Sequence, residues 1–329
     1  MTKDDLKGFD KAVKRQEALA QNSKDLMAKT KKYFSADLEV EENEISNLKD
    51  GDELILVRAS QQRGLEIARE MERYDLAALA LIIKAANDIA AQGGHFVSFA
   101  DQIICGEGAA DEAAKFRHYL AAAAGKAHAV YMSAPNVDVT TSIFTDGILA
   151  TGVGFGIKRN SYAKGKISKG DSIIGICTPS TAGIGIDIYS KVILEDMRNG
   201  VNDYIEELDE IAGEAMITPP PNYANLIQKL YDSFDVKDII PISKLGLVPD
   251  IAAVTGGEDK IKIQPSDWEY PKIIKLMQKE ANLTDDFIIK HFNAGIGLAI
   301  IVDEKVELPI LLELNEMGVE AYSIGKIIK

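Results

Sequence analysis

The first feature that could do chemistry is a polar stripe on an otherwise apolar helix. The run "DLAALALIIKAANDIAAQ" at residues 75–92 is apolar on nearly every side, and two helix-breaking glycines follow it. The polar residues of the stripe are Lys84, Asn87, Asp88 and Gln92. Their spacing places them on one face, which either lines a site or packs against another polar surface. A carboxylate at Asp88 must be paired, hydrated or bound to metal, and Lys84 is its simplest protein partner.

A second feature lies in the stretch "IIKHFNAGIGLAIIVDEK" at residues 288–305, where Asn293, Gly295 and Gly297 interrupt an apolar run. Interior glycines weaken a strand because they lose the most backbone freedom and offer no side chain to pack. We therefore expect another backbone or a ligand to pass close to this strand, with Asn293 able to hydrogen-bond to it. The alternative is a β-bulge or a close helix crossing.

Other candidate motifs carry little information. The glycine-rich "GVGFGI" at residues 152–157 lies within a strand pattern and lacks the following helix that a dinucleotide site needs. The "TGGEDK" run at residues 255–260 is typical of a surface turn. The four histidines are His95, His118, His128 and His291. Their positions suggest no catalytic pairing.

Composition narrows the functional class. The 329 residues are 46% hydrophobic and 27% charged, with a formal net charge of −14 and no basic cluster. Nucleic acid is therefore not expected as a partner, because phosphate backbones are bound by concentrated Lys and Arg. The two cysteines, Cys105 and Cys177, lie in apolar runs and are expected to be buried thiols in a reducing compartment. The charged N-terminus and the lack of an 18-residue apolar run predict a cytoplasmic protein with no membrane partner.

The predicted elements that position these residues are α and β in both halves. We expect a helix at 9–34, strands at 54–59, 96–105 and 147–158, and a helix at 111–129. After a turn at Lys169-Gly170-Asp171, we expect a strand, a helix from about Ile186 and an acidic surface helix at 202–215. The breaker "TPPPN" precedes the remaining helices and strands. We predict two domains, 1–165 and 166–329.

Four stretches together carry a family resemblance. They are "SDWEYPKIIKLMQKEANLTDDFIIKHFNAGIGLAIIV", "YDLAALALIIKAANDIAAQGG", "KGDSIIGI" and "GVEAYSIGKII". They resemble the aminoimidazole ribonucleotide synthetases, the phosphoribosylformylglycinamidine cyclo-ligases of purine biosynthesis. The resemblance runs from about residue 50 to the end, and the helix with the Asn-Asp pair and the FNxGIG stretch are its most specific parts.

This resemblance implies an α+β fold of the two-domain aminoimidazole ribonucleotide synthetase type. Its N-terminal domain has a mixed sheet with helices and forms a homodimer, and its C-terminal domain is also α+β. The implied reaction is ATP-dependent ring closure, in which a substrate amide oxygen is phosphorylated and an amine of the same molecule displaces phosphate. The implied cofactors are ATP and Mg²⁺, and the implied partner is a nucleotide or ribonucleotide substrate.

Several family positions carry over to this sequence. The resemblance implies a nucleotide-binding role for Asn87, Asp88, Asp101, Ser180, Asn293 and Gly295, and a metal-binding role for Asp75 and Asp88. Carboxylates at these positions could hold Mg²⁺, which prefers oxygen ligands. The alternative is that they are helix-capping and surface aspartates.

Four family motifs are altered. The phosphate loop Asp-Gly-Val-Gly-Thr-Lys is replaced by "RASQQRGLE" at residues 58–66, and Gly-Gly-Glu-Thr-Ala-Glu by "YMSAPN" at 131–136. The Ser-Gly-x-His-Ser-Asn-Gly loop becomes "STAGIGI" at 180–186, and a Thr-Gly-Gly-Gly turn becomes Ser243-Lys244-Leu245-Gly246. Arg58 and Arg63 either replace the lost lysine as phosphate donors or are solvated loop arginines.

Two functional hypotheses follow. The first is a divergent synthetase that closes a ring or runs a related ATP-dependent ligation with a rebuilt phosphate site. The alternative is a non-catalytic homologue, a pseudoenzyme that serves as a binding or partner subunit on the same dimeric scaffold. A kinase or a selenophosphate synthetase of the same superfamily fits less well, because those relatives also use acidic, glycine-rich nucleotide loops.

The three N-terminal strands carry more apolar surface than one small domain can cover, which predicts a homodimer built through them.

Overall fold

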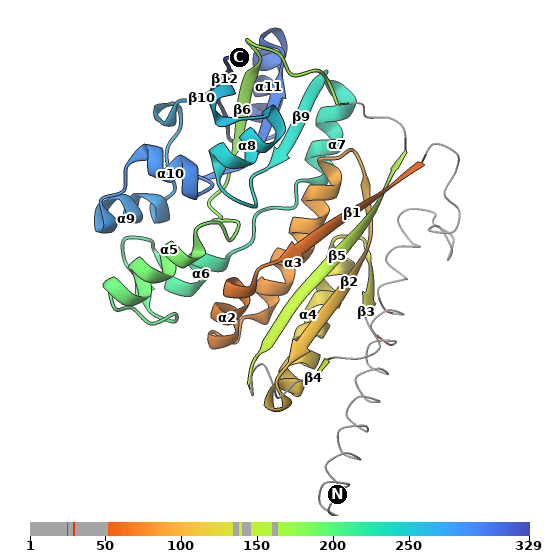
Figure 1. Ribbon diagram of the computed structural model, residues 1–329, viewed down its shortest axis with the longest axis vertical. Helices are drawn as coiled ribbons and strands as arrows, with labels where there is room; N and C mark the ends of the chain where they lie inside the picture. The colour runs from red at the N-terminus through yellow and green to blue at the C-terminus, as the bar shows by residue number, and fades with distance from the viewer. Residues whose placement is uncertain (1–24, 26–28, 30–51, 134–137, 140–145, 160–163) are drawn as a thin grey trace, which may run out of the picture.

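The computed structural model describes residues 25, 29, 52–133, 138–139, 146–159 and 164–329. The helix predicted at 9–34 lies outside these residues apart from Asp25 and Lys29, which are helical. Residues 134–136 of the "YMSAPN" stretch also lie outside them. The described chain forms two five-stranded sheets, one from each half, together with a small hairpin (Figure 1).

The first sheet has the strand order β1-β5-β2-β3, and β4 pairs with β2. Its strands are β1 (Asp52–Ser60), β2 (His95–Cys105), β3 (Val130–Ser133), β4 (Asp138–Val139) and β5 (Ile148–Arg159). β5 is antiparallel to β1 and β2, whereas β2 and β3 are parallel. The parallel pair is possible because α4 (Ala110–Lys126) carries the chain back between the two strands. The three long strands and this helix confirm the predicted elements.

Helices cover one face of the first sheet. They are α2 (Gln62–Glu70), α3 (Tyr74–Ala90), the short 3₁₀ turn η2 (Glu107–Ala109) and α4. The glycines of β5 let α3 approach closely: a Cβ on Gly154 would lie 2.8 Å from Ala85 Cβ, and one on Gly156 would lie 2.3 Å from Ile89 Cγ2. The glycine-rich run in this strand therefore serves helix–sheet packing.

The second sheet is antiparallel, with the strand order β10-β12-β6-β11-β9. Its strands are β6 (Ser172–Cys177), β9 (Val236–Pro241), β10 (Ile261–Ile263), β11 (Ile296–Val302) and β12 (Ala321–Ile327). Every residue of β11 is buried, because it is flanked by β6 and β9 and has side chains in hydrophobic clusters on both faces. The FNxGIG stretch thus leads into the central strand of this half.

The helices of the second half are α5 (Ile186–Tyr189), the π-helix η3 (Ser190–Asp196), α6 (Ala212–Ile217), α7 (Ala224–Ser233), α8 (Leu247–Thr255), α9 (Lys272–Ala281), α10 (Asp285–His291) and α11 (Glu304–Glu316), with 3₁₀ turns η4 (Glu258–Lys260) and η5 (Pro265–Asp267). Among them, α7, α8 and α11 pack against this sheet, and the others lie beside it or toward α2 and α3 (Figure 1). The acidic helix predicted at 202–215 is wrong. This segment forms a hairpin of β7 (Tyr204–Ile205) and β8 (Glu210–Ile211) before α6. Asp209 adopts a left-handed φ of 59°, which ends any helix there.

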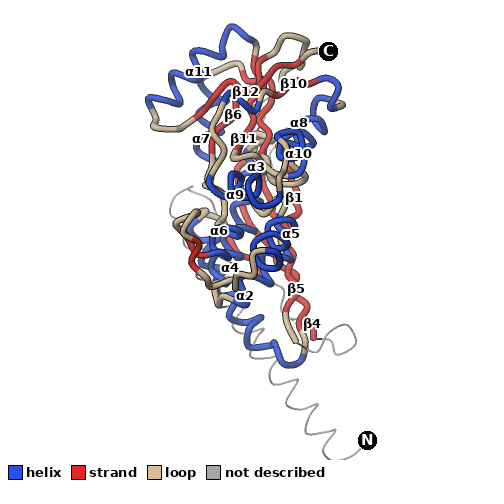
Figure 2. The backbone as a smooth tube through the Cα atoms, turned by 90° about the vertical axis from the view of Figure 1, so that its left-hand side faces the viewer, coloured by secondary structure: helices blue, strands red, loops and turns tan. Residues whose placement is uncertain are grey.

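One hydrophobic cluster spans both halves, and a second, smaller one lies mainly in the second half. The first cluster of buried side chains runs from Ile55 in β1 to Ile327 in β12. In Figure 2 the second sheet lies above the first, so the molecule is elongated. Within the described residues, no helix is both long and apolar enough to cross a membrane. Cys105 is a buried thiol and Cys177 a half-buried one.

Candidate functional site

The polar stripe of α3 faces the C-terminal half, where it meets two loops and the segment that leads into α7. Between them lies a small, partly open cavity of about 10 Å³. Its polar lining consists of Gln61, Lys84, Asn87, Tyr223 and Ser243. A cavity of this size holds about one water-sized group. The cleft between the two halves is therefore almost closed at this point.

Lys84 is the charged group of this cavity. Its Nζ donates hydrogen bonds to the carbonyl and hydroxyl oxygens of Ser243 at 2.9 and 2.8 Å. The Asp88 carboxylate lies 3.6 Å from the same Nζ, so the ion pair expected from the sequence is present. Burial lowers the pKa of Lys84 because the ammonium has lost much of its water, and Asp88 opposes that shift.

Ser243 is held in place by the helix that follows it. The carboxylate of Asp250 in α8 accepts hydrogen bonds from the backbone amides of Ser243, Lys244 and Leu245, each at 3.0 Å. This carboxylate thus satisfies the backbone amides of the turn at residues 243–246, which aligns with the family's Thr-Gly-Gly-Gly motif.

Asn87 binds the segment before α7. Its side-chain oxygen accepts from the Tyr223 amide at 2.7 Å, and its Nδ2 donates to the Pro221 carbonyl at 3.0 Å. Both ends of the amide are thus used to join the halves of the chain. Of the two interpretations of the polar stripe, packing against another polar surface accounts for Asn87.

Tyr223 and Gly297 meet in the cavity. A Cβ on Gly297 would lie 2.2 Å from Tyr223 Oη, so the ring hydroxyl occupies the place of a side chain at 297. Tyr223 is 5% exposed, and its hydroxyl has no hydrogen-bond partner among the described residues. Burial raises its pKa to about 12. Contact with the Thr178 side chain opposes that rise in pKa; the Thr178 hydroxyl also accepts from the Ser180 amide at 3.2 Å, which leaves its own O–H available.

The FNxGIG residues explain the interrupted apolar run. Asn293 is buried, and its Nδ2 donates to the Ser180 carbonyl at 2.7 Å. Gly295 has a φ of +78°, and a Cβ there would lie 2.4 Å from Pro271 Cδ. The strand register also shifts between Ile296 and Leu298. The glycines thus accommodate close side chains and a β-bulge, and Asn293 contacts another backbone as expected.

Asp101 lies apart from this cavity, inside the first half. Its carboxylate accepts from Arg117 Nε at 3.0 Å and from the Tyr131 hydroxyl at 2.8 Å, and all three side chains are buried. Burial raises the pKa of Tyr131 well above its usual value, and the Asp101 charge adds to that shift. The sequence singled out Asp101 but gave no signal for Arg117, which lies on the following helix.

The predicted metal ligands also have protein partners. Asp75 accepts from Arg73 at 2.9 Å, and this hydrogen bond lowers its pKa. It lies 13 residues before Asp88 on α3, or roughly 20 Å along a helix that rises 1.5 Å per residue, so one ion cannot bind both. Within the described part of the chain, no three His, Cys, Asp or Glu residues are grouped to hold a metal ion. As placed, these carboxylates do not fit Mg²⁺.

The segment that replaces the family's phosphate loop is helical. Strand β1 ends at Ser60, and α2 begins at Gln62. Gln61 Nε2 donates to the Ala182 carbonyl at 3.1 Å, and Gln62 Nε2 donates to the Ile148 carbonyl at 3.0 Å. Two adjacent glutamines thus tie α2 to both halves. The sequence reasoning missed this helix because it treated the whole stretch as an altered loop.

The two arginines of that stretch are exposed. Arg58 lies on the outer face of β1, and Arg63 pairs with Glu66 at 2.9 Å one turn along α2. Their placement favours the interpretation as solvated arginines over that of phosphate donors.

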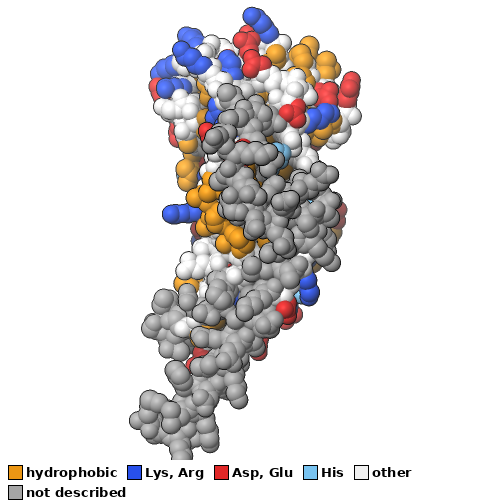
Figure 3. All heavy atoms as spheres, turned by 90° about the vertical axis from the view of Figure 1, so that its right-hand side faces the viewer, with side chains coloured by type: hydrophobic (Ala, Val, Ile, Leu, Met, Phe, Trp, Pro, Cys, Tyr) orange, Lys and Arg blue, Asp and Glu red, His pale blue; other side chains and the backbone are white. Residues whose placement is uncertain are grey.

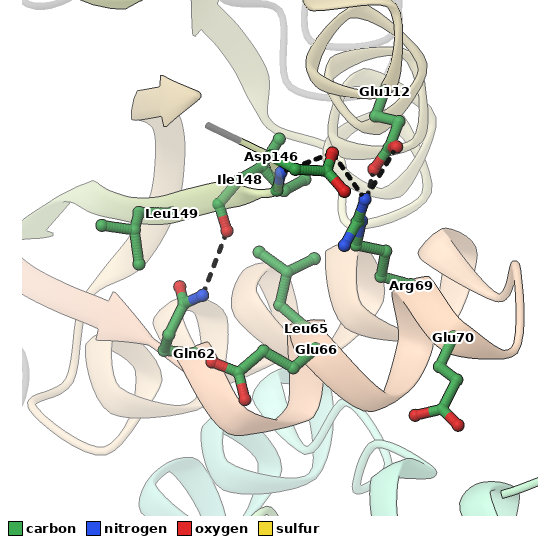
Figure 4. Close-up of a pocket in the computed structure, with 10 residues that line it drawn as sticks. Gln62, Leu65, Glu66, Arg69, Glu70, Glu112, Asp146, Ile148 and Leu149 are labelled. Carbon is green, nitrogen blue, oxygen red and sulfur yellow. Dashed lines mark hydrogen bonds and ion pairs between the residues drawn. The ribbon is translucent and has the colours of Figure 1, made fainter. Parts of the chain in front are cut away.

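A larger open depression runs along α2 (Figure 4). It has a volume of about 620 Å³. Arg69 lies between two carboxylates there, with Nε 2.6 Å from Glu112 and Nη2 2.9 Å from Asp146. Glu66 and Glu70 also line it, so its charge is acidic. None of these residues carried a signal in the sequence.

Known proteins were compared with this chain, and no family model matches it. The phosphoribosylformylglycinamidine cyclo-ligase of Syntrophus aciditrophicus is 26% identical over 279 residues, which cover 84% of this chain and 80% of the relative. The enzyme of the same name from Alkaliphilus oremlandii is 26% identical over 287 residues, 86% of this chain and 84% of the relative. The chain is a distant relative of these cyclo-ligases. The resemblance seen in the sequence is thereby confirmed.

Solved structures of other proteins share the fold of this chain. A thiamine-monophosphate kinase from Stenotrophomonas maltophilia is 12% identical with a TM-score of 0.66, covering 86% of this chain and 84% of its own. The E. coli hydrogenase maturation protein HypE is 18% identical with a TM-score of 0.62, covering 94% and 90%. AaThiL complexed with AMPPCP and TMP has a TM-score of 0.62 at 13% identity, covering 86% and 83%. The predicted aminoimidazole ribonucleotide synthetase-like α+β fold is confirmed.

Proposed function

We propose that this protein is an ATP-dependent ligase of the cyclo-ligase type that binds a nucleotide or ribonucleotide in the cleft between its two halves. The proposed reaction is the purine ring closure or a related ligation: ATP phosphorylates an amide oxygen, and an amine displaces phosphate. The observation that supports it is the convergence of α3, the turn at Ser243 and Tyr223 on one small cavity with a lysine at its wall. The length of the match to the cyclo-ligases adds to that support.

The described side chains suggest specific roles in such a reaction. Lys84 supplies a buried positive charge, which is worth more in a water-poor cleft than on the surface. Asn87 fixes the backbone at Pro221 and Tyr223, which shapes the wall opposite α3. Positioning by rigid contacts of this kind is the main contribution that proteins make to phosphoryl transfer.

We propose as the nucleotide site the residues that the sequence predicted. They are Asn87, Asp88, Asp101, Ser180, Asn293 and Gly295. Asp88 would have to leave Lys84 to reach a magnesium ion, and Asp101 would have to leave Arg117. We also propose the two domains 1–165 and 166–329. The two sheets support that boundary, since β5 ends at Arg159 and β6 begins at Ser172.

A second candidate function has its own observation in favour. A non-catalytic partner subunit would need neither a phosphate loop nor free carboxylates. The helix α2, tied to both halves by Gln61 and Gln62, stands where the relatives have their phosphate loop. In this second function the protein has the same fold but does not catalyse the reaction.

Calorimetric titration of the full chain with ATP, with and without Mg²⁺, separates the two functions. The ligase proposal expects binding at millimolar nucleotide or below, weakened in Lys84→Met. Lys191→Met is the matched control, because Lys191 is exposed and pairs with Glu195 at 3.0 Å. If the wild-type chain binds no ATP under either condition, the ligase proposal fails and the partner-subunit proposal remains.

A further inference from the structure

The hydroxyl of Tyr223 is the unusual group of the cleft. A buried hydroxyl without a partner costs free energy, so proteins rarely keep one. Tyr223 is 95% buried, and its Oη points at Gly297 on the wall of the 10 Å³ cavity. Tyr231, on the same segment of chain, shows the ordinary arrangement: its hydroxyl donates to the Ala91 carbonyl at 2.8 Å.

The other polar groups of the cavity decide what could bind there. Lys84 donates to Ser243 twice, and both acceptors are uncharged. Asp88 lies 3.6 Å from the ammonium, beyond hydrogen-bonding distance. The ammonium therefore forms an ion pair with Asp88, while its two short hydrogen bonds go to uncharged oxygens. The side-chain oxygen and one N–H of Asn87 are used, and the Tyr223 hydroxyl is the buried polar atom of the lining for which no hydrogen bond is found among the described residues.

We propose that Tyr223, Lys84 and Ser243 form a subsite that binds one anionic oxygen, either phosphoryl or carboxylate, of a ligand whose remainder lies outside the cavity. A cation is excluded because the ammonium of Lys84 would repel it. The volume fits one oxygen atom and its hydrogen bonds, which is about the space of one water. The inference rests on the proposed function, since it assigns this oxygen to the ligand of the same cleft.

The test is thermal melting of the full chain with inorganic phosphate or acetate, against chloride at equal ionic strength. Wild type should melt at a higher temperature with at least one of the two anions, and the arm that responds identifies the source of the oxygen. Tyr223→Phe should melt no lower than wild type without anion, because it removes an unpartnered hydroxyl. Its anion affinity should fall about tenfold, the loss expected for a hydrogen bond to a charged group.

Tyr231→Phe is the matched control, and Ser243→Ala is the second variant. The first should melt lower than wild type, because it loses the bond to Ala91, and should keep the full response to anion. The second should weaken the response by loosening Lys84. Equal responses in wild type and Tyr223→Phe, or no response to either anion in wild type, would overturn the subsite.

The same variants separate this inference from the proposed function. If wild type binds ATP and Tyr223→Phe binds it equally well, the ligase proposal stands and the subsite falls. If wild type binds no ATP but its response to phosphate depends on Tyr223, the subsite stands and the ligase proposal falls.

Discussion

At the residue scale, Asp88 is the predicted ligand whose role a single substitution can decide. It is buried beside Lys84, and removing its charge would leave the lysine in a low-dielectric site with only Ser243 as partner. We expect Asp88→Asn to lower the free energy of unfolding by about 1–3 kcal/mol, because the pair with Lys84 is lost, and to weaken nucleotide binding, because Asp88 belongs to the proposed site. Urea unfolding beside ATP titration measures both quantities.

Asp286→Asn is the control for this substitution, since its pair with Lys290 has the same spacing but is exposed. It should change stability very little. If Asp88→Asn instead abolishes Mg²⁺-nucleotide binding and leaves stability intact, Asp88 is a metal ligand as the family resemblance implies.

Glu112 gives a residue-scale prediction about pH. The hydrogen bond from Arg69 lowers its pKa below the ordinary value of 4.5. A carboxyl group whose pKa is lower in the folded state than in the unfolded state stabilises the fold. The stabilisation is complete above the pKa of the unfolded state and is lost as the pH falls through the pKa of the folded state. We expect wild type to lose about 0.5–1 kcal/mol more than Glu112→Gln on acidification below about pH 4.5, a modest amount because the pair is partly exposed.

The comparison needs urea midpoints measured through this pH range. Glu70→Gln, on the exposed side of the same depression, should keep the slope of wild type. Parallel curves for wild type and Glu112→Gln would show that the Arg69 pair contributes nothing to folding.

At the scale of elements, the entry into β11 should tolerate side chains poorly. Gly295 combines a φ of +78° with a close approach to Pro271, and Gly297 faces Tyr223 Oη. Gly295→Val and Gly297→Val should each lower the free energy of unfolding by about 1–3 kcal/mol. Gly295→Val should cost more, because a ring at Pro271 and a strained backbone both oppose it.

Ala281→Val at the end of α9 is the reference, since it adds two methyl groups at a half-buried helical position. Differential scanning calorimetry of the three variants gives the ranking. Equal melting temperatures would mean that the glycines are incidental.

At the scale of the whole molecule, the outer face of the first sheet predicts self-association. Along β1 the residues alternate, with Ile55 and Val57 buried against α3 while Leu54 and Leu56 are 45% and 57% exposed. Hydrophobic side chains also gather at mid-height on the side of the molecule drawn in Figure 3. An exposed apolar strand face of this kind favours pairing with a second copy.

We therefore expect a homodimer by light scattering at micromolar protein. Leu56→Glu should shift the mass toward the monomer because it places a charge in the interface. Leu245→Glu, at a residue that is 65% exposed in the second half, should leave the mass unchanged. A wild-type monomer mass at these concentrations would contradict the prediction.

The sequence by itself determined most of the elements. Runs of branched aliphatics predicted β1, β2, β5 and β6, and an apolar helix with terminal glycines predicted α3, because these signals depend on neighbours along the chain. The resemblance to the cyclo-ligases was also visible in the sequence, since the Asn-Asp pair and the FNxGIG stretch are local motifs. The helix predicted at 202–215 was wrong, because turn-forming residues favour a hairpin there despite the helix-forming glutamates.

Only the tertiary structure decided the partners of the site residues. Asn87 bonds to the amide of Tyr223, 136 residues away, and Asn293 to the carbonyl of Ser180, 113 residues away. Arg117 in α4 donates to Asp101 in β2 because α4 packs against that strand. A hydrogen bond or ion pair depends on distance in space, and sequence spacing fixes that distance only within one element. For this reason the sequence could list the polar groups of the cleft, whereas the fold determined which of them bind one another. The fold also left the Tyr223 hydroxyl without a hydrogen bond among the described residues.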